Sequence, residues 1–149
     1  MPIQLNVEPE TDEQMAKFGA AAVDAVAAMN LIILADHPEW MMSPAQAGIQ
    51  YDPPPVSYRT YNHSICSIPE VLRRGHAKCD SITAWEVAWR RARGEDAFTG
   101  ILPQGDGLFH VVTFVRKNGR IEVVDASYSL GMYNGYGCSS NPNDQTCEC

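Results

Sequence analysis

The segment Gly75-His76-Ala77-Lys78-Cys79-Asp80-Ser81 places a cysteine where a loop runs into a helix. Apolar residues recur after it at helical spacing, and Gly94 is suited to end the helix, so we expect a helix over Cys79–Arg93. A thiolate at a helix N-terminus is stabilised by the helix dipole, which makes Cys79 a candidate nucleophile. The buried face of this helix is expected to comprise Ile82, Trp85, Ala88 or Trp89, and Ala92.

A histidine and an aspartate occupy the ends of a predicted hairpin downstream. The run from His110 to Val115 has strong strand character, Asn118-Gly119 is a two-residue turn signal, and Ile121 to Asp125 forms the return strand. With Asn118-Gly119 at the centre of the turn, Val112 faces Asp125 in the antiparallel register. His110 and Val112 share a face, so His110 and Asp125 become diagonal neighbours at roughly 7–8 Å between backbones. A slip of one residue would put them on opposite faces.

The three residue types can form a nucleophilic triad. His110 would remove the thiol proton of Cys79 and return it to the leaving amine, and Asp125 would fix the imidazole tautomer. The backbone N–H of Cys79 is one candidate donor to the oxyanion, and Trp40 in the upstream loop is another. Each triad residue also has an ordinary interpretation, as a small core residue, a structural histidine and a turn-forming aspartate.

The rest of the chain predicts a single mixed domain. A helix is expected over Thr11–Ala35, with Phe18, Ala22, Val26 and Met29 on one apolar stripe and with Leu31–Leu34 buried. Asp36-His37-Pro38 would end it. The other expected elements are short extended pieces at Gly48–Tyr51 and Val56–Tyr61, a helix at Ile68–Arg74 closed by Gly75, a strand at Phe98–Leu102, a turn cluster at Pro103–Gly107, and a loop-like tail from Tyr128.

Composition narrows the classes of partner. The formal net charge is −7, which disfavours a general nucleic-acid groove because phosphate binding needs a basic stripe. The N-terminus has neither the basic nor the apolar region of a signal peptide, and the run Met29–Ala35 is too short to span a membrane. We therefore expect a cytoplasmic location, or packaging into a particle assembled there.

Five cysteines allow three arrangements. All five would be thiols in a reducing cytoplasm. After oxidation, Cys79 would stay free while Cys66, Cys138, Cys147 and Cys149 form two disulfides. A third arrangement uses the repeated His-x-x-Cys spacing, in which His63, Cys66, His76 and Cys79 would close a tetrahedral zinc site and make Cys79 a ligand.

Several motifs together resemble the transglutaminase-like cysteine peptidase superfamily, in the small form carried by bacteriophages and prophages. The resemblance covers about residues 11–133, which predicts one domain over 1–133 and a Cys-containing tail over 134–149. Ala77-Lys78 stands where relatives often have Gly-Asp, and Ala126 replaces a usual proline. The motifs that carry the resemblance are Gly75–Ser81, Ala84-Trp85, Arg90–Ala97, Leu108–Val112, Val124–Ser127, Leu130-Gly131-Met132, His37-Pro38 and Gly48–Tyr51.

The resemblance implies an α+β fold with a papain-like core, in which an N-terminal helix and the nucleophile helix pack on a small antiparallel sheet. It implies Cys79 as nucleophile, His110 as general base and acid, and Asp125 as the orienting carboxylate. The implied activity is a cofactor-free hydrolase or acyltransferase that acts on amide bonds of a protein or peptide through a thioester. The alternatives are a non-catalytic virion structural or assembly component on the same fold, in contact with other virion proteins, and the zinc-bound structural module. The implied location is the host cytoplasm during assembly, or the virion, without nucleic-acid or membrane binding.

Overall fold

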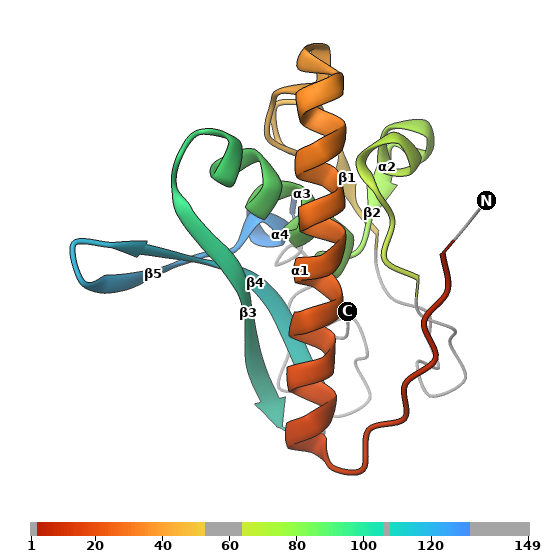
Figure 1. Cartoon of the computed structure of the whole chain (residues 1–149), viewed down its shortest axis with the longest axis vertical. Helices are drawn as coiled ribbons and strands as arrows, with labels where there is room; N and C mark the ends of the chain where they lie inside the picture. The colour runs from red at the N-terminus through yellow and green to blue at the C-terminus, as the bar shows by residue number, and fades with distance from the viewer. Residues whose placement is uncertain (1–2, 53–63, 106–107, 132–149) are drawn as a thin grey trace.

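A computed structural model describes residues 3–52, 64–105 and 108–131, and shows a mixed α+β arrangement with an N-terminal helix and two small sheets (Figure 1). The expected strand at Val56–Tyr61 lies outside these residues. The elements are α1 (Asp12–Asp36), η1 (Pro38–Trp40), β1 (Gln50–Tyr51), α2 (Ile68–Arg74), β2 (His76–Ala77), α3 (Cys79–Ala92), β3 (Asp96–Gly105), β4 (Leu108–Lys117), β5 (Arg120–Val124) and α4 (Ala126–Ser129).

Helix α1 begins and ends where the sequence predicts. Thr11 is its N-cap, and the Thr11 side chain accepts a hydrogen bond from the N–H of Gln14 at 3.1 Å. The predicted buried stripe is wrong, because Phe18 and Met29 are 39% and 40% exposed. The side of the helix that contacts the rest of the domain is formed by positions one residue later in the sequence than the predicted stripe. The buried positions are Val23, Ala27, Asn30 and Leu34.

The C-terminal end of α1 also differs from the prediction of all-round burial. Leu34 is fully buried, whereas Ile32 is 65% exposed. Continuous apolar sequence therefore did not mean that every side of this turn is covered.

The three-stranded sheet has the order β3-β4-β5 and is antiparallel throughout. Lys117 pairs with Arg120, and the pairing continues to Thr113 opposite Val124, which confirms the predicted register. The turn residues Asn118 and Gly119 have φ of 53° and 73°, the conformation for which Asn-Gly is favoured. Strand β3 is longer than expected and reaches Gly105.

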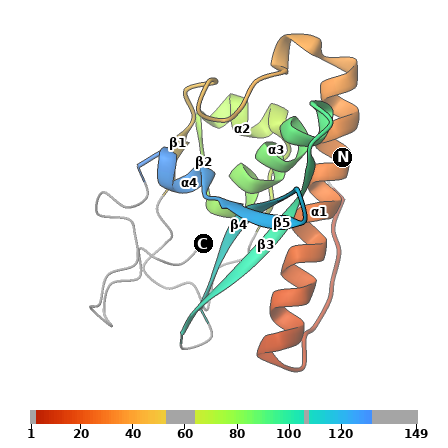
Figure 2. The same ribbon diagram turned by 90° about the vertical axis from the view of Figure 1, so that its left-hand side faces the viewer.

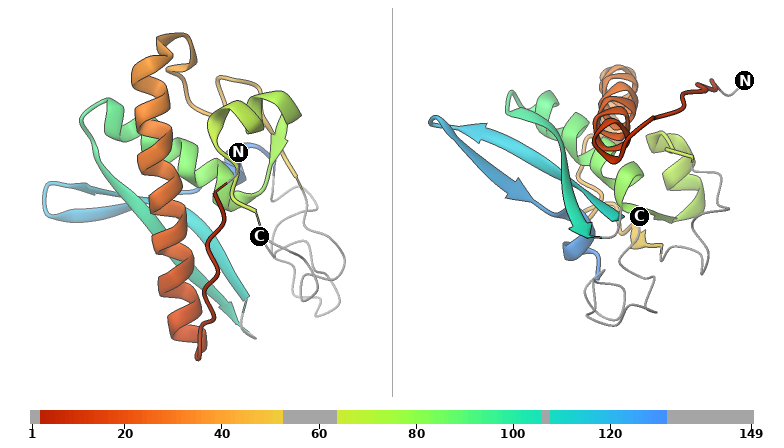
Figure 3. Two further views of the ribbon diagram at one scale, coloured as in Figure 1. Left: turned by 45° about the vertical axis from the view of Figure 1, so that its right-hand side comes forward. Right: turned by 90° about the horizontal axis from the view of Figure 1, so that it is seen from below.

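Helices α1 and α3 pack on the same face of this sheet (Figures 2 and 3). One apolar cluster fills the space between them and comprises Val23, Ala27, Ala84, Val87, Ala97 and Val115. Two polar side chains of α1 join the helix to β3 and to the start of α2. The Asp24 carboxylate accepts from the Thr99 N–H at 3.0 Å and from its hydroxyl at 2.7 Å, and Asn30 Oδ1 accepts from the Ile68 N–H at 3.0 Å.

A second small sheet lies beside the N-terminus of α3. Strands β1 and β2 pair in parallel, with Gln50 opposite His76 and Tyr51 opposite Ala77. Gly75, at φ 76°, ends α2 and lets the chain turn directly into β2. A second apolar cluster joins this region to α3 and includes Leu34, Tyr51, Ile68, Val71, Cys79, Ile82 and Trp85.

Candidate active site

His110 and Asp125 form a direct side-chain pair. His110 Nε2 lies 2.7 Å from Asp125 Oδ2, a contact that the predicted register allows. His110 is 3% exposed, and its strand holds it in place by pairing with Leu102 on β3. A carboxylate can only accept hydrogen bonds, so the Nε2 atom of a neutral His110 carries the proton in this pair. Asp125 thereby selects the tautomer in which Nδ1 is the basic nitrogen.

The second oxygen of Asp125 has a different partner. Asp125 is the N-cap of α4, and its Oδ1 accepts from the Tyr128 N–H at 3.1 Å. The sequence did not predict this helix, because only four residues form it and the segment is rich in small and polar types. One carboxylate thus orients the imidazole and starts α4.

Cys79 is the first residue of α3 and is 0% exposed. Its N-cap is Lys78, an extended residue whose side chain makes no capping hydrogen bond to the helix. The apolar cluster around Cys79 includes Val111 and Ala126, the chain neighbours of His110 and Asp125. One turn further along α3, the Thr83 hydroxyl donates to the Val111 carbonyl at 3.2 Å. The N-terminus of α3 is therefore joined to the part of the sheet that carries the His110–Asp125 pair.

Cysteine oxidation differs from the predicted pattern. Cys79 is disulfide-bonded, whereas Cys66 is a free, half-buried thiol. One of the three expected arrangements was the reverse, with Cys79 free and Cys66 paired. Cys66 packs against the apolar cluster of Cys79, and its N–H donates to Ser81 Oγ at 2.8 Å. This packing holds Cys66 as a core residue. Cys138, Cys147 and Cys149 lie outside the described residues.

A charged cluster beside Cys79 was missed by sequence reasoning. Asp52 Oδ2 lies 3.2 Å from Lys78 Nζ and 3.2 Å from His76 Nδ1. The parallel pairing of β1 with β2 makes these contacts, because it places Asp52 just beyond Ala77. The Lys78 side chain is 12% exposed, so its stem is packed rather than free in solvent. A two-residue parallel pair leaves no sequence periodicity by which to predict this cluster.

The carboxyl group of Asp80 lies on the first turn of α3, next to Cys79. Asp80 is 2% exposed, and its Oδ1 accepts from the Ser81 N–H at 2.6 Å. An acidic side chain at this end of a helix is favoured by the dipole, but a negative charge beside Cys79 opposes a thiolate. Lys78 contributes the opposite sign on the other side of the cysteine.

The upstream loop is anchored to α3 by an indole. Trp85 Nε1 donates to the Met42 carbonyl at 2.8 Å, and Trp85 is fully buried. Trp40, the expected oxyanion donor, stacks on His37 with ring centroids 4.3 Å apart. Its backbone N–H donates to the His37 carbonyl at 3.0 Å, so this N–H is already hydrogen-bonded within the local turn.

The zinc arrangement has little support in the described residues. Within residues 3–52, 64–105 and 108–131, no group of three or more His, Cys, Asp or Glu side chains could hold a metal ion. Cys79 is disulfide-bonded, so its sulfur is not arranged as a thiolate ligand. His63 lies outside the described residues.

Comparisons with known protein families, with curated proteins and with solved structures give no match. The candidate site is therefore defined by its residues and geometry alone.

Proposed function

We propose that the protein is a transglutaminase-like cysteine hydrolase or acyltransferase with a papain-like core, in which Cys79, His110 and Asp125 act on an amide bond. The observation that carries the proposal is the 2.7 Å contact between His110 Nε2 and Asp125 Oδ2. The position of Cys79 at the first residue of α3 supports it, as does the apolar cluster shared with Val111 and Ala126.

The tautomer of His110 determines which of its nitrogens takes part in each proton transfer. Asp125 holds the proton on Nε2, so His110 Nδ1 is the atom that would accept the proton of the Cys79 thiol. The thiolate sulfur then bonds to the amide carbon, and the carbon–nitrogen bond breaks as His110 gives its proton to the leaving amine. Water, deprotonated by His110, cleaves the thioester and releases a carboxylic acid with the thiol restored. In a transfer reaction, an amine takes the place of water.

The start of α3 would stabilise the negative charge in these steps. Backbone N–H groups at a helix N-terminus point toward an anion, and the N–H of Cys79 would serve as one oxyanion donor. Lys78, the residue before Cys79, carries a positive charge and is held by Asp52. These groups favour the thiolate over the buried thiol.

Reduction of Cys79 is a requirement of this mechanism. A sulfur in a disulfide cannot attack an amide, so the structure corresponds to an inactive form. The resemblance to phage-borne relatives suggests a setting for both forms. The thiol would be present in the host cytoplasm during assembly, and the disulfide would form in a released particle.

Labelling of the reduced protein by iodoacetamide tests the function, with Cys66 as a reference thiol in the same chain. Peptide mapping after labelling at a series of pH values should show Cys79 reacting at a lower pH than Cys66. His110→Ala should remove this difference and leave the rate at Cys66 unchanged. If Cys79 reacts no faster than Cys66 at every pH, the proposed nucleophile is wrong.

The oxidised state of Cys79 favours a second candidate, a non-catalytic virion structural or assembly component on the same scaffold. Here the cysteine contributes a covalent link and the His110–Asp125 pair only braces the sheet against α4. This candidate predicts that His110→Ala lowers thermal stability while leaving the pH dependence of Cys79 labelling unchanged. Fixed stoichiometry with purified virions would support it further.

A further inference from the structure

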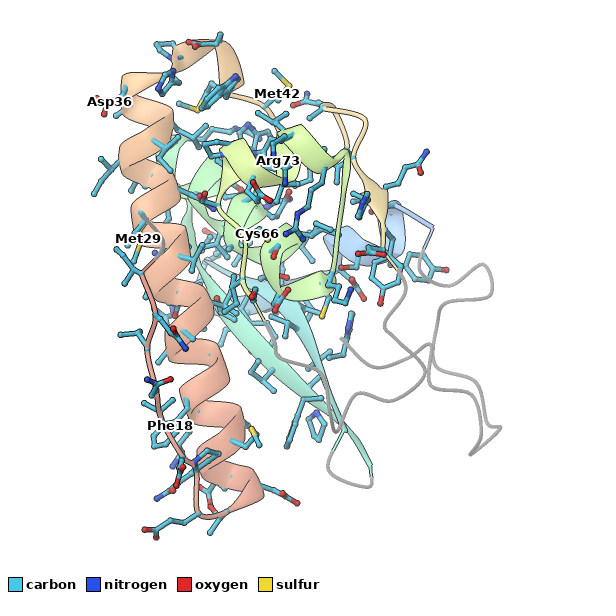
Figure 4. The ribbon with its side chains drawn as sticks, turned by 90° about the vertical axis from the view of Figure 1, so that its right-hand side faces the viewer. Phe18, Met29, Asp36, Met42, Cys66 and Arg73 are labelled. Atoms are coloured by element: carbon cyan, nitrogen blue, oxygen red, sulfur yellow. The ribbon has the colours of Figure 1, made fainter. Side chains whose placement is uncertain are left out.

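The outward side of α1 is an apolar surface without an occupant among the described residues. Met15, Phe18, Met29 and Ile32 are 50%, 39%, 40% and 65% exposed. They lie along the helix together with half-buried Ala22 and Ala25; Figure 4 labels Phe18 and Met29 on α1. We call these six residues the α1 stripe. They recur at alternating spacings of three and four, which keeps them on one side of a helix.

Charged groups do not interrupt this side of the helix. The only charged residue between positions 18 and 35 is Asp24. Its carboxylate bonds to Thr99 on β3 and lies 3.6 Å from the Arg91 guanidinium, so it faces the domain rather than the α1 stripe. The polar Asn30 is also buried against the domain. Solvent-facing helix surfaces are normally polar, and a continuous apolar one indicates a contact surface.

The N-terminal arm does not cover the α1 stripe. Residues 3–10 run beside α1 (Figures 3 and 4). Their apolar side chains Ile3, Leu5 and Val7 remain 77%, 72% and 66% exposed. These side chains are therefore not seated on the helix.

The α1 stripe is complementary to itself under two-fold symmetry. In an antiparallel pair of α1 helices, Met15 would meet Ile32, Phe18 would meet Met29, and Ala22 would meet Ala25 of the other copy. Small residues then lie at the crossing point, where two helices approach most closely, and large residues fill the space toward both ends. The 3-4 spacing matches the seam of two helices that cross at about 20°. We propose that α1 forms an antiparallel dimer interface with a second copy of this chain.

A lipid surface fits the same helix less well. By length and apolar composition, α1 could cross a membrane, as core helices of soluble proteins and signal sequences also could. However, on the side of α1 that faces the domain, Asp24 and Asn30 make hydrogen bonds to other parts of the domain. Lys17 is the only basic residue of α1, and it pairs with Glu13 at 3.0 Å. Helices that lie on membranes usually carry several Lys or Arg residues toward anionic lipid.

Sedimentation velocity on the full reduced chain, from low to high micromolar concentration, tests the dimer. Ile32→Glu should weaken association at least about tenfold, because it buries a charge in the apolar seam. Ile121→Glu is the matched control, since Ile121 is 53% exposed on β5 and should leave association unchanged. Thermal melts of both variants check that they fold.

A charge pair tests the antiparallel register. Phe18→Lys and Met29→Glu should each weaken the dimer. The double variant should recover most of the loss, because the lysine introduced in each copy meets the glutamate introduced in the other. A wild-type chain that stays monomeric throughout overturns the proposal, as does a dimer insensitive to Ile32→Glu. Binding of the monomer to anionic vesicles, abolished by Ile32→Glu, would overturn it in favour of a lipid occupant.

Discussion

Asp125 uses both carboxylate oxygens, and an amide substitution can separate the two uses. Asp125→Asn keeps an oxygen that can accept from the Tyr128 N–H, but it removes the charge that supports the His110 imidazolium. Asp125→Ala removes both. We expect both variants to lower the labelling rate of reduced Cys79 at neutral pH, by about 10²-fold or more if the pair is catalytic.

Stability should distinguish these two variants. Loss of an N-cap costs about 1 kcal/mol, so Asp125→Ala should unfold at lower urea concentration than Asp125→Asn. Urea unfolding followed by circular dichroism measures the difference. Equal stability of the two variants would mean that the α4 cap contributes nothing.

Glu86 gives a pH-dependent contribution to stability. Burial raises the pKa of its carboxyl above the ordinary value of 4.5, although Arg90 donates to it at 2.8 Å. The folded chain therefore holds this proton more tightly than the unfolded chain does. The favourable contribution of Glu86 is complete below pH 4.5 and is lost as pH rises through the raised pKa.

The comparison with Glu86→Gln isolates this effect, because glutamine does not titrate. The free energy of unfolding of the wild-type chain, relative to that of Glu86→Gln, should fall as pH rises from 4.5 and then level off. Urea unfolding at a series of pH values measures it. A relative stability that increases over this range would contradict the raised pKa.

The turn between β4 and β5 sets the register that brings His110 to Asp125. Gly119 has φ of 73°, so Gly119→Ala should lower the free energy of unfolding by about 1–2 kcal/mol without changing the two-residue turn.

Gly19 lies within α1 with no atom within 4 Å of an added Cβ. Gly19→Ala should therefore raise stability by up to about 1 kcal/mol. Chemical denaturation should show that Gly119→Ala lowers the free energy of unfolding and that Gly19→Ala raises it. A lower free energy of unfolding in both variants would contradict the prediction for Gly19.

Local sequence signals predicted most elements of the fold. The caps of α1, the left-handed Gly75 and the Asn118-Gly119 turn each depend on a few adjacent residues, and all three were confirmed. The buried side of α1 was predicted wrongly because apolar residues occur on both sides of this helix. Hydrophobicity alone cannot say which side meets the domain and which would meet a partner.

Part of the candidate site could also be predicted from local sequence signals, and part of it could not. The pairing of His110 with Asp125 followed from the hairpin register, which is local in sequence. The contact of Asp52 with Lys78 joins segments 26 residues apart through a parallel pairing, and no local pattern encodes it. The oxidation state of Cys79 also depends on the spatial arrangement of cysteines rather than on spacing.

At the level of the intact chain, the disulfide can be mapped directly. Cys79 is disulfide-bonded, whereas Cys66 is a free thiol. Alkylation of the unreduced, denatured protein should modify Cys66 but not Cys79, and mass spectrometry should find the peptide of Cys79 linked through a disulfide to a second cysteine peptide. Alkylation of all five cysteines before any reductant is added would contradict the assignment.

The short pairing of β1 with β2 has a consequence for how the site opens. It joins distant segments through few backbone hydrogen bonds, among them Gln50 N–H to Gly75 and Asp52 N–H to Ala77 at 3.0 and 2.7 Å. Strand β4, by contrast, pairs with β3 along its length and with β5 from Thr113 to Lys117. Amide hydrogens of Gln50 and Asp52 should therefore exchange with deuterium well before those of β4. Local opening of this pairing would separate Asp52 from Lys78 while the strand that carries His110 stays folded.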